Sequence, residues 1–149
     1  MENINIVDLN DFRKKHIAVL CLPGLDSFLP AIVEHLSKKH FVRTCYSKSL
    51  QEMEELIAWA DLVMIEWCNE LAIELTQKSK MLEEKRVIIR LHSYEALSGY
   101  VQHVRWSVVD ALVFVAEHIK NLVLKQMPGL TNPELNPPEI FVIPNGVPV

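Results

Sequence analysis

Short apolar runs that alternate with longer amphipathic stretches are the feature that most constrains the fold of this chain. The runs are rich in Val, Ile and Leu, and each is followed by a turn and then by apolar residues at helical spacing. Runs of this kind are typical of strands buried on both faces. Alternating strands and helices form right-handed βαβ units around a parallel sheet. The sequence therefore predicts an α/β, Rossmann-like three-layer sandwich with a parallel sheet of about six strands.

The pattern also places the individual elements. The predicted strands cover residues 16–22, 41–46, 61–67, 86–91, 110–116 and 140–143. Helix starts are expected where a capping residue precedes an apolar period, at Asp26 or Ser27, at Ser49 with Glu52, and at Asn69. A short helix is expected over residues 93–103, and a longer one from Glu117 to Met127. Residues 1–15 form a polar lead-in, and residues 16–143 form one domain.

Composition excludes several classes of function. The net charge is −4, with no basic stripe, so we expect no nucleic-acid partner. The 3 cysteines have no paired spacing, and the 6 histidines have no ligand spacing, so neither a disulfide framework nor a metal site is expected. No signal peptide is recognised, and no apolar run approaches the roughly 20 residues of a membrane helix. We expect a cytoplasmic protein, and contact with a membrane surface stays open.

Polar residues follow the strand predicted over residues 86–91. His92, Ser93 and Glu95 lie where the carboxyl end of that strand reaches the edge of the sheet. Ligands of open parallel sheets bind in the crevice at this edge. His92 and Glu95, three residues apart, are candidates for proton transfer or for hydrogen bonds to sugar hydroxyls. The alternative is a histidine that ends the strand for structural reasons.

Glu66 ends another predicted strand and is costly to bury alone. It either pairs with Arg90 or faces the cleft, and the sequence leaves both alternatives open. Arg90 lies two residues before His92 and so points to the same face, where it pairs with Glu66 or Glu95. Trp67 either stacks on a sugar or covers the core, and the core is favoured.

The first strand is followed by a turn that contains Gly24. A dinucleotide fold requires three glycines in this turn, so NAD or FAD binding is disfavoured. The turn is therefore either a plain strand-to-helix connection or a loop that contacts a bound sugar or phosphate. No phosphate-binding lysine motif and no Gly-x-Ser-x-Gly nucleophile elbow occurs.

Three segments together resemble the N-terminal half of a family 4 glycosyltransferase of the GT-B fold. They are RLHSYE at residues 90–95, DALVFVAEHIK at residues 110–120 and VIPNGV at residues 142–147. Ala116 replaces the serine that the family commonly has before its glutamate, and Gly24 stands where the family often has two glycines. The resemblance spans residues 17–149.

The resemblance implies a retaining transfer of a sugar from a nucleotide-sugar to a glycan or lipid-linked acceptor, without a metal or another cofactor. It implies a catalytic position for His92. The implied substrate-binding residues are Gly24, Glu66, Ser93, Glu95 and Glu117. Residues 144–149 begin a hinge, with Asn145 and Gly146 as hinge residues. The second domain, with most donor contacts, is expected beyond Val149, so the chain alone is expected to be inactive.

The alternative function is a non-catalytic Rossmann-like or flavodoxin-like binding or interaction domain. A receiver domain is disfavoured, because the first strand is not followed by a pair of acidic residues. A sugar-nucleotide epimerase is disfavoured, because its glycine-rich loop is missing.

Overall fold

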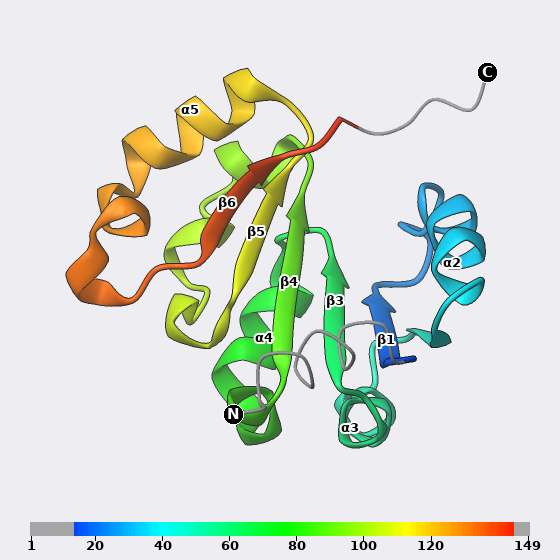
Figure 1. Cartoon of the computed structure of the whole chain (residues 1–149). Helices are drawn as coiled ribbons and strands as arrows, with labels where there is room; N and C mark the ends of the chain where they lie inside the picture. Colours follow the sequence, from blue (N-terminus) through cyan, green and yellow to red (C-terminus); the bar gives the residue numbers. More distant parts are fainter. Residues whose placement is uncertain (1–13, 145–149) are drawn as a thin grey trace, which may run out of the picture.

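Six parallel strands form one sheet in the order β2-β1-β3-β4-β5-β6 (Figure 1). The computed structural model describes residues 14–144, so Asn145 and Gly146, which were predicted to be hinge residues, and most of the lead-in lie outside the described part. The strands are β1 (His16–Cys21), β2 (Phe41–Tyr46), β3 (Leu62–Glu66), β4 (Arg86–Leu91), β5 (Ala111–Phe114) and β6 (Glu139–Val142). The predicted Rossmann-like parallel sheet is confirmed.

Helices connect the strands as βαβ units. They are α2 (Leu29–Ser37), α3 (Leu50–Trp59), α4 (Glu70–Lys78) and α5 (Glu117–Gln126). Short 3₁₀ turns complete the connections at Lys80–Glu84, Tyr94–Leu97, Tyr100–Gln102, Trp106–Val108, Pro128–Thr131 and Pro133–Leu135. None of the helices within residues 14–144 combines the length and the apolar character needed to cross a bilayer.

Two predicted helix caps are confirmed. The Ser49 hydroxyl accepts a hydrogen bond from the Glu52 amide at 3.3 Å, and the Asn69 side chain accepts one from the Leu71 amide at 3.1 Å. Each bond satisfies a backbone N–H that the first turn of a helix leaves without a partner. The return bond of a capping box is absent at Ser49, whose amide donates to Ser47 instead.

The predicted cap of α2 is wrong. The residue before this helix is Phe28, whose side chain makes no capping bond. Asp26 contributes through its backbone, since its carbonyl accepts a hydrogen bond from the Leu29 amide at 3.0 Å. Pro30 sits in the first turn, where its missing N–H has no cost.

The helix predicted over residues 93–103 is also wrong. Two 3₁₀ turns occupy this segment, and between them Gly99 has a positive φ of 80°. Such a φ ends any right-handed helix and suits glycine, which has no Cβ. The buried Glu95 also binds backbone amides outside its own turn.

Strands β2 and β4 have the predicted bounds, and β3 and β5 are shorter than predicted. Asp61 and Asp110, which begin the predicted runs, act as caps of neighbouring strands instead. The Asp61 carboxylate accepts a hydrogen bond from the His16 amide, and the Asp110 carboxylate accepts one from the Val87 amide, both at 2.8 Å. These carboxylates therefore lie at the amino edge of the sheet, outside the ladder.

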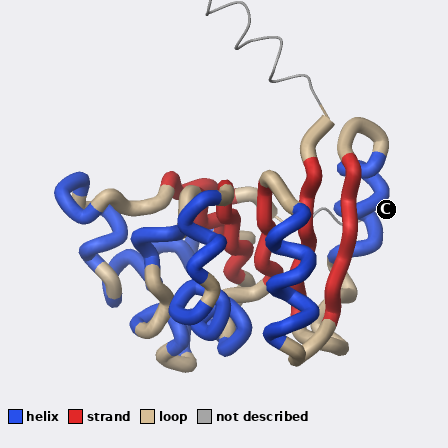
Figure 2. The backbone as a smooth tube through the Cα atoms, turned by 90° about the horizontal axis from the view of Figure 1, so that it is seen from below, coloured by secondary structure: helices blue, strands red, loops and turns tan. Residues whose placement is uncertain are grey.

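The helices cover the two faces of the sheet unequally (Figure 1 and Figure 2). One face packs against α3, α4, α5 and the turns between β4 and β5, and it buries the larger core. The other face packs against α2 and buries a smaller core around Leu29. Within residues 14–144, α2 is the sole helix on that second face.

The strand order creates a switch point between β1 and β3. The chain runs from β1 to β2 at one edge of the sheet, then crosses back to β3 on the other side of β1. The loops that follow β1 and β3 therefore diverge and leave a crevice at the carboxyl ends of the strands. Open parallel sheets generally bind their ligands in a crevice at this position.

Ile89, on the central strand β4, is fully buried in the larger core. We predict that Ile89→Ala lowers the free energy of unfolding by about 2–5 kcal/mol, because it removes buried methylenes and leaves a cavity. Ile143→Ala is the matched control, since Ile143 is 55% exposed, and it should change stability by less than about 0.5 kcal/mol. Urea denaturation measures both, and equal losses would contradict the assignment of the core.

Candidate functional site

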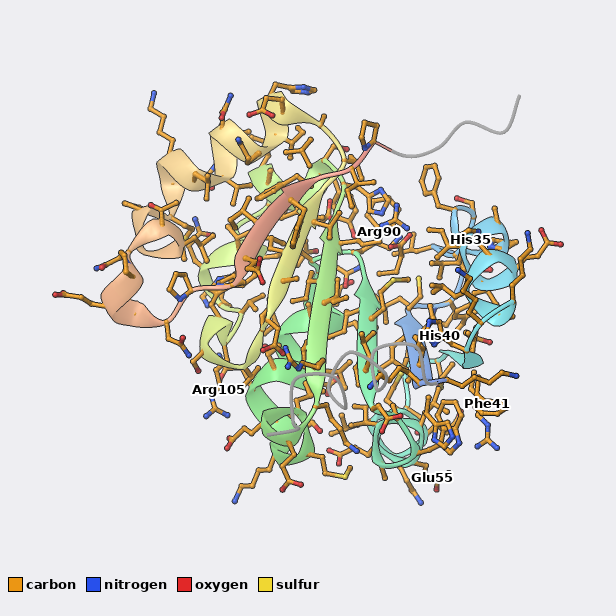
Figure 3. The ribbon with its side chains drawn as sticks, in the orientation of Figure 1. His35, His40, Phe41, Glu55, Arg90 and Arg105 are labelled. Carbon is orange, nitrogen blue, oxygen red and sulfur yellow. The ribbon has the colours of Figure 1, made fainter. Side chains whose placement is uncertain are left out.

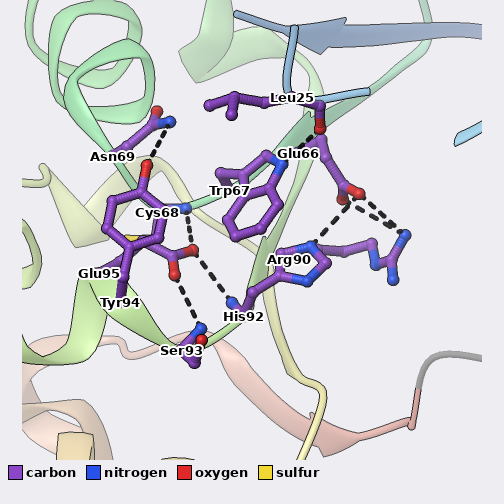
Figure 4. Close-up of polar contacts among 10 residues, drawn as sticks. All are labelled: Leu25, Glu66, Trp67, Cys68, Asn69, Arg90, His92, Ser93, Tyr94 and Glu95. Carbon is purple, nitrogen blue, oxygen red and sulfur yellow. Dashed lines mark hydrogen bonds and ion pairs between the residues drawn. The ribbon is translucent and has the colours of Figure 1, made fainter. Parts of the chain in front are cut away.

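The ends of β3 and β4 bring three ionisable side chains together. Glu66 and Arg90 are register partners on these neighbouring parallel strands, and His92 follows two residues later on the same face. Arg90 Nη1 lies 3.3 Å from Glu66 Oε1, and His92 Nε2 lies 3.3 Å from Glu66 Oε2 (Figure 4). The sequence left open whether Glu66 pairs with Arg90 or faces the cleft, and in the structure it pairs with Arg90.

This cluster is withdrawn from solvent. Glu66 is fully buried, Arg90 is 8% exposed and His92 is 3% exposed. A carboxylate in such surroundings is held only if cations and donors face it, since the loss of hydration is large. Arg90 supplies the permanent positive charge, and the His92 ring lies next to the same carboxylate.

Aromatic rings cover the cluster. The His92 ring contacts both Phe28, at a centroid distance of 5.1 Å, and Trp67, at 3.8 Å, and the Phe28 and Trp67 centroids lie 6.4 Å apart. The Tyr94 ring lies 5.5 Å from the Trp67 ring. Phe28 is 41% exposed and Tyr94 is 39% exposed, so both offer aromatic surface to solvent. We call Glu66, Arg90, His92, Phe28, Trp67 and Tyr94 the His92 cluster.

Trp67 has a left-handed backbone, with φ of 76°. This conformation is a genuine outlier for a bulky residue and has to be held by its surroundings. The indole Nε1–H donates a hydrogen bond of 2.7 Å to the Leu25 carbonyl, in the loop after β1. This bond ties the two diverging loops of the switch point together. Backbone strain of this kind occurs preferentially at functional sites.

Glu95 has a different place from the predicted one. Its carboxylate is fully buried and accepts hydrogen bonds from the amides of Cys68 and His92 at 3.0 Å and of Ser93 at 2.9 Å. The predicted arrangement, with the Glu95 and His92 side chains facing the cleft together, is therefore not formed. Glu95 instead fixes the backbone at the ends of β3 and β4 (Figure 4).

The remaining predicted site residues are exposed. Gly24 lies in the loop after β1 with φ of 86° and open space where a Cβ would stand. Ser93 is exposed directly after His92. Glu117 begins α5 after β5, and its exposed carboxylate pairs with Lys120. The structure thus brings Glu66 and His92 into one cluster. Gly24 lies in the loop after β1, which is bonded to the cluster through the Leu25 carbonyl and Trp67.

A groove of 420 Å³ extends from the cluster along the sheet. Phe28 and Arg90 line it together with apolar residues of α2, of the sheet and of the segment after β6. These apolar residues include Ile32, Leu36, Met64, Ile88, Val113 and Ile143. The cluster therefore lies beside open space rather than inside a closed core.

The surroundings of the crevice shift several pKa values. Burial, with a smaller effect of the Glu66 charge, raises the pKa of the Cys21 thiol at the end of β1 to about 12. Burial also raises the pKa of the Cys68 thiol and of Tyr94. Both thiols are therefore protonated at neutral pH, and neither is an activated nucleophile. Among residues 14–144, no group of three His, Cys, Asp or Glu side chains is placed to hold a metal ion.

Comparison with family models, with curated proteins and with solved structures found no match.

Reasoning from the sequence missed Phe28 and Tyr94 and favoured a core position for Trp67. Each of these residues lies in or directly after a turn at the carboxyl edge. An aromatic side chain that follows a strand end is the signal that would have found them.

The contribution of the buried Glu66–Arg90 pair to stability can be tested by substitution. We predict that Arg90→Leu lowers the free energy of unfolding by about 3–5 kcal/mol, because it leaves the Glu66 carboxylate without its permanent countercharge. The double variant Glu66→Leu, Arg90→Leu should recover most of this loss, since no buried charge is then left alone. Urea denaturation of the single and double variants measures the difference, and additive losses would contradict the pair.

The left-handed backbone conformation of Trp67 can also be tested by substitution. We predict that Trp67→Gly is more stable than Trp67→Ala by about 1 kcal/mol, because only glycine adopts a positive φ without strain. The matched control is Trp59 in α3, where Trp59→Gly should be less stable than Trp59→Ala by about 1 kcal/mol. Thermal unfolding of the four variants gives the two differences, and the same sign at both positions would contradict the strained backbone.

Proposed function

We propose that this domain forms the acceptor side of a glycosyltransferase, which moves a sugar from a nucleotide-sugar to a glycan or lipid-linked acceptor. The observation that carries the proposal is the position of His92. It follows β4, next to the switch point, and its ring is fixed by Glu66, Phe28 and Trp67. The likeness of residues 90–95, 110–120 and 142–147 to family 4 glycosyltransferases supports the same function.

The chemistry of the cluster suits carbohydrate. An imidazole both donates and accepts hydrogen bonds near neutral pH, as sugar hydroxyls do. The exposed parts of Phe28 and Tyr94 offer apolar ring surface, which suits the C–H face of a sugar ring. Ligand sites of this kind combine apolar walls with a few fixed polar groups.

In the proposed reaction, the bond between the anomeric carbon and the phosphate oxygen of the nucleoside diphosphate breaks, and its electron pair leaves with the diphosphate. The acceptor hydroxyl oxygen forms the new glycosidic bond, and its proton leaves with the released diphosphate. His92 holds the transferred sugar during this exchange. The proposal assigns most donor contacts to protein outside residues 14–144, so we expect no sugar transfer by the isolated 149-residue chain.

A binding domain without catalysis is the second candidate. It is favoured by the burial of the cluster, because His92 is 3% exposed and Glu66 is fully buried. Buried polar groups that interact with each other can stabilise a structure without taking part in a reaction. This candidate predicts ligand binding at the carboxyl edge and no turnover by the protein in any form.

Sugar transfer by the protein as its own cells make it is the direct test. The purified protein is assayed with radiolabelled nucleotide-sugars and a glycan and lipid extract of the same cells. We predict transfer from at least one donor, and a fall in kcat/KM of about 100-fold or more for His92→Ala, because the contact to the transferred sugar is lost.

The matched control is His103→Ala, since His103 is exposed and lies outside the cluster. It should keep kcat/KM within about twofold of the unaltered protein. Absence of transfer with every donor would overturn the proposal in favour of the binding domain. Full activity of the His92→Ala protein would remove His92 from the site.

A further inference from the structure

A second feature lies at the amino edge of the sheet, at the opposite end of the strands from the His92 cluster. Exposed lysines of two segments and an exposed phenylalanine lie there. One segment precedes β1, and the other joins α2 to β2. We call this surface the amino-edge patch, and it consists of Lys14, Lys15, Lys38, Lys39 and Phe41.

Backbone hydrogen bonds hold the two segments side by side. The Phe41 amide donates to the Lys15 carbonyl at 2.9 Å, and the Lys15 amide donates to His40 Nδ1 at 3.1 Å. Figure 3 shows His40 and Phe41 next to each other and well separated from Arg90. The fold therefore brings the two lysine segments together, although Lys15 and Lys38 lie 23 positions apart in the sequence.

Phe41 adds an apolar group to this charge. Its side chain is 50% exposed at the start of the edge strand β2, and Lys14 Nζ lies 4.9 Å from the centre of its ring. On the same strand, the Arg43 guanidinium lies 4.5 Å from the ring centre of Trp59. The aromatic and cationic character thus continues along the exposed edge of the sheet.

The lysines of the patch are exposed. None of the ion pairs formed within residues 14–144 involves them. The Asp61 carboxylate, also at the amino edge, accepts a hydrogen bond from the His16 amide. The whole chain carries a net charge of −4, so this concentration of positive charge is a local feature.

We infer that the amino-edge patch docks this protein on an anionic phospholipid surface. Clustered lysines are attracted to anionic headgroups, and an exposed aromatic ring among them buries apolar area at the boundary with the acyl chains. Lysine stems lie along apolar surface while their ammonium groups stay in the headgroup layer. Single-stranded nucleic acid is a poorer fit, because its binding requires a tract of stacking rings along a basic groove.

The position of the patch also determines the orientation of the protein on a membrane. β1 has 6 residues, so its carboxyl end lies about 20 Å from its amino end. A protein that rests on its amino-edge patch therefore holds the His92 cluster about 20 Å above the headgroups. If the proposed sugar transfer holds, a lipid-linked acceptor presents its growing end at that height. The docking itself does not depend on the proposed function.

Vesicle co-sedimentation of the 149-residue chain tests the inference. The probes are vesicles of phosphatidylcholine alone and of phosphatidylcholine with phosphatidylglycerol. We expect binding to the anionic vesicles that is about tenfold or more tighter than to the neutral ones, and that weakens as salt is raised.

Charge reversal on the patch should weaken binding more than the same change elsewhere. Lys38→Glu with Lys39→Glu is expected to lower the affinity by about 30-fold or more, because each cation contributes about fivefold. The matched control is Lys80→Glu with Lys125→Glu, two exposed lysines outside the patch, which should stay within about twofold. Circular dichroism confirms that both double variants are folded.

Phe41→Ser separates the lipid surface from an acidic protein. We expect a loss of about fivefold with the salt dependence retained, since only the apolar contribution is removed. Three outcomes would overturn the inference: equal binding to neutral and anionic vesicles, equal losses in the patch and control variants, or binding of a polyglutamate peptide as tight as that of vesicles with no effect of Phe41→Ser.

Discussion

The arrangement of the crevice depends on one buried carboxylate. Glu95 accepts hydrogen bonds from the amides of Cys68, His92 and Ser93, and thereby joins the ends of β3 and β4. A buried carboxylate that accepts hydrogen bonds from several backbone amides fixes the chain around it. Trp67 and His92, next to these bound amides, are placed against each other, and Glu66 then meets Arg90 and the His92 ring. The contact between the Trp67 and His92 rings thus depends on the backbone that Glu95 fixes. The group of charged side chains around Glu66 depends in turn on that ring contact.

The sheet could be predicted because its determinants are local. The strands β2 and β4 have their predicted bounds. The apolar residues of β4 lie between Arg86 and His92, where the composition changes clearly. Ser49 and Asn69 were found as caps because a cap acts on amides two or three residues away. The pair of Glu66 and Arg90 was one of two alternatives, because a buried charge requires a partner and the strand register supplies one.

The parts that escaped prediction depend on tertiary contacts. Trp67 adopts a positive φ against its own preference, and only the bond to Leu25 and the stack on His92 explain it. Glu95 was expected in the cleft, because nothing local shows that a side chain will bind the amide of Cys68, 27 positions away in sequence. The expected helix after β4 failed for the same reason, together with the left-handed Gly99. Functional sites are where local and global preferences are expected to disagree.

The most direct test of a ligand site at the carboxyl edge is the indole NMR signal of Trp67. The chain has 3 tryptophans, so ¹⁵N labelling gives a small set of indole N–H signals in which Trp59 and Trp106 act as internal references. The Trp67 N–H donates to Leu25 across the switch point and should respond to any ligand that enters there. During titration with nucleotide-sugars and with glycan acceptors, we expect the Trp67 signal to move while the other two stay. An unchanged Trp67 signal with every ligand, or equal movement of all the signals, would contradict a binding site at the His92 cluster.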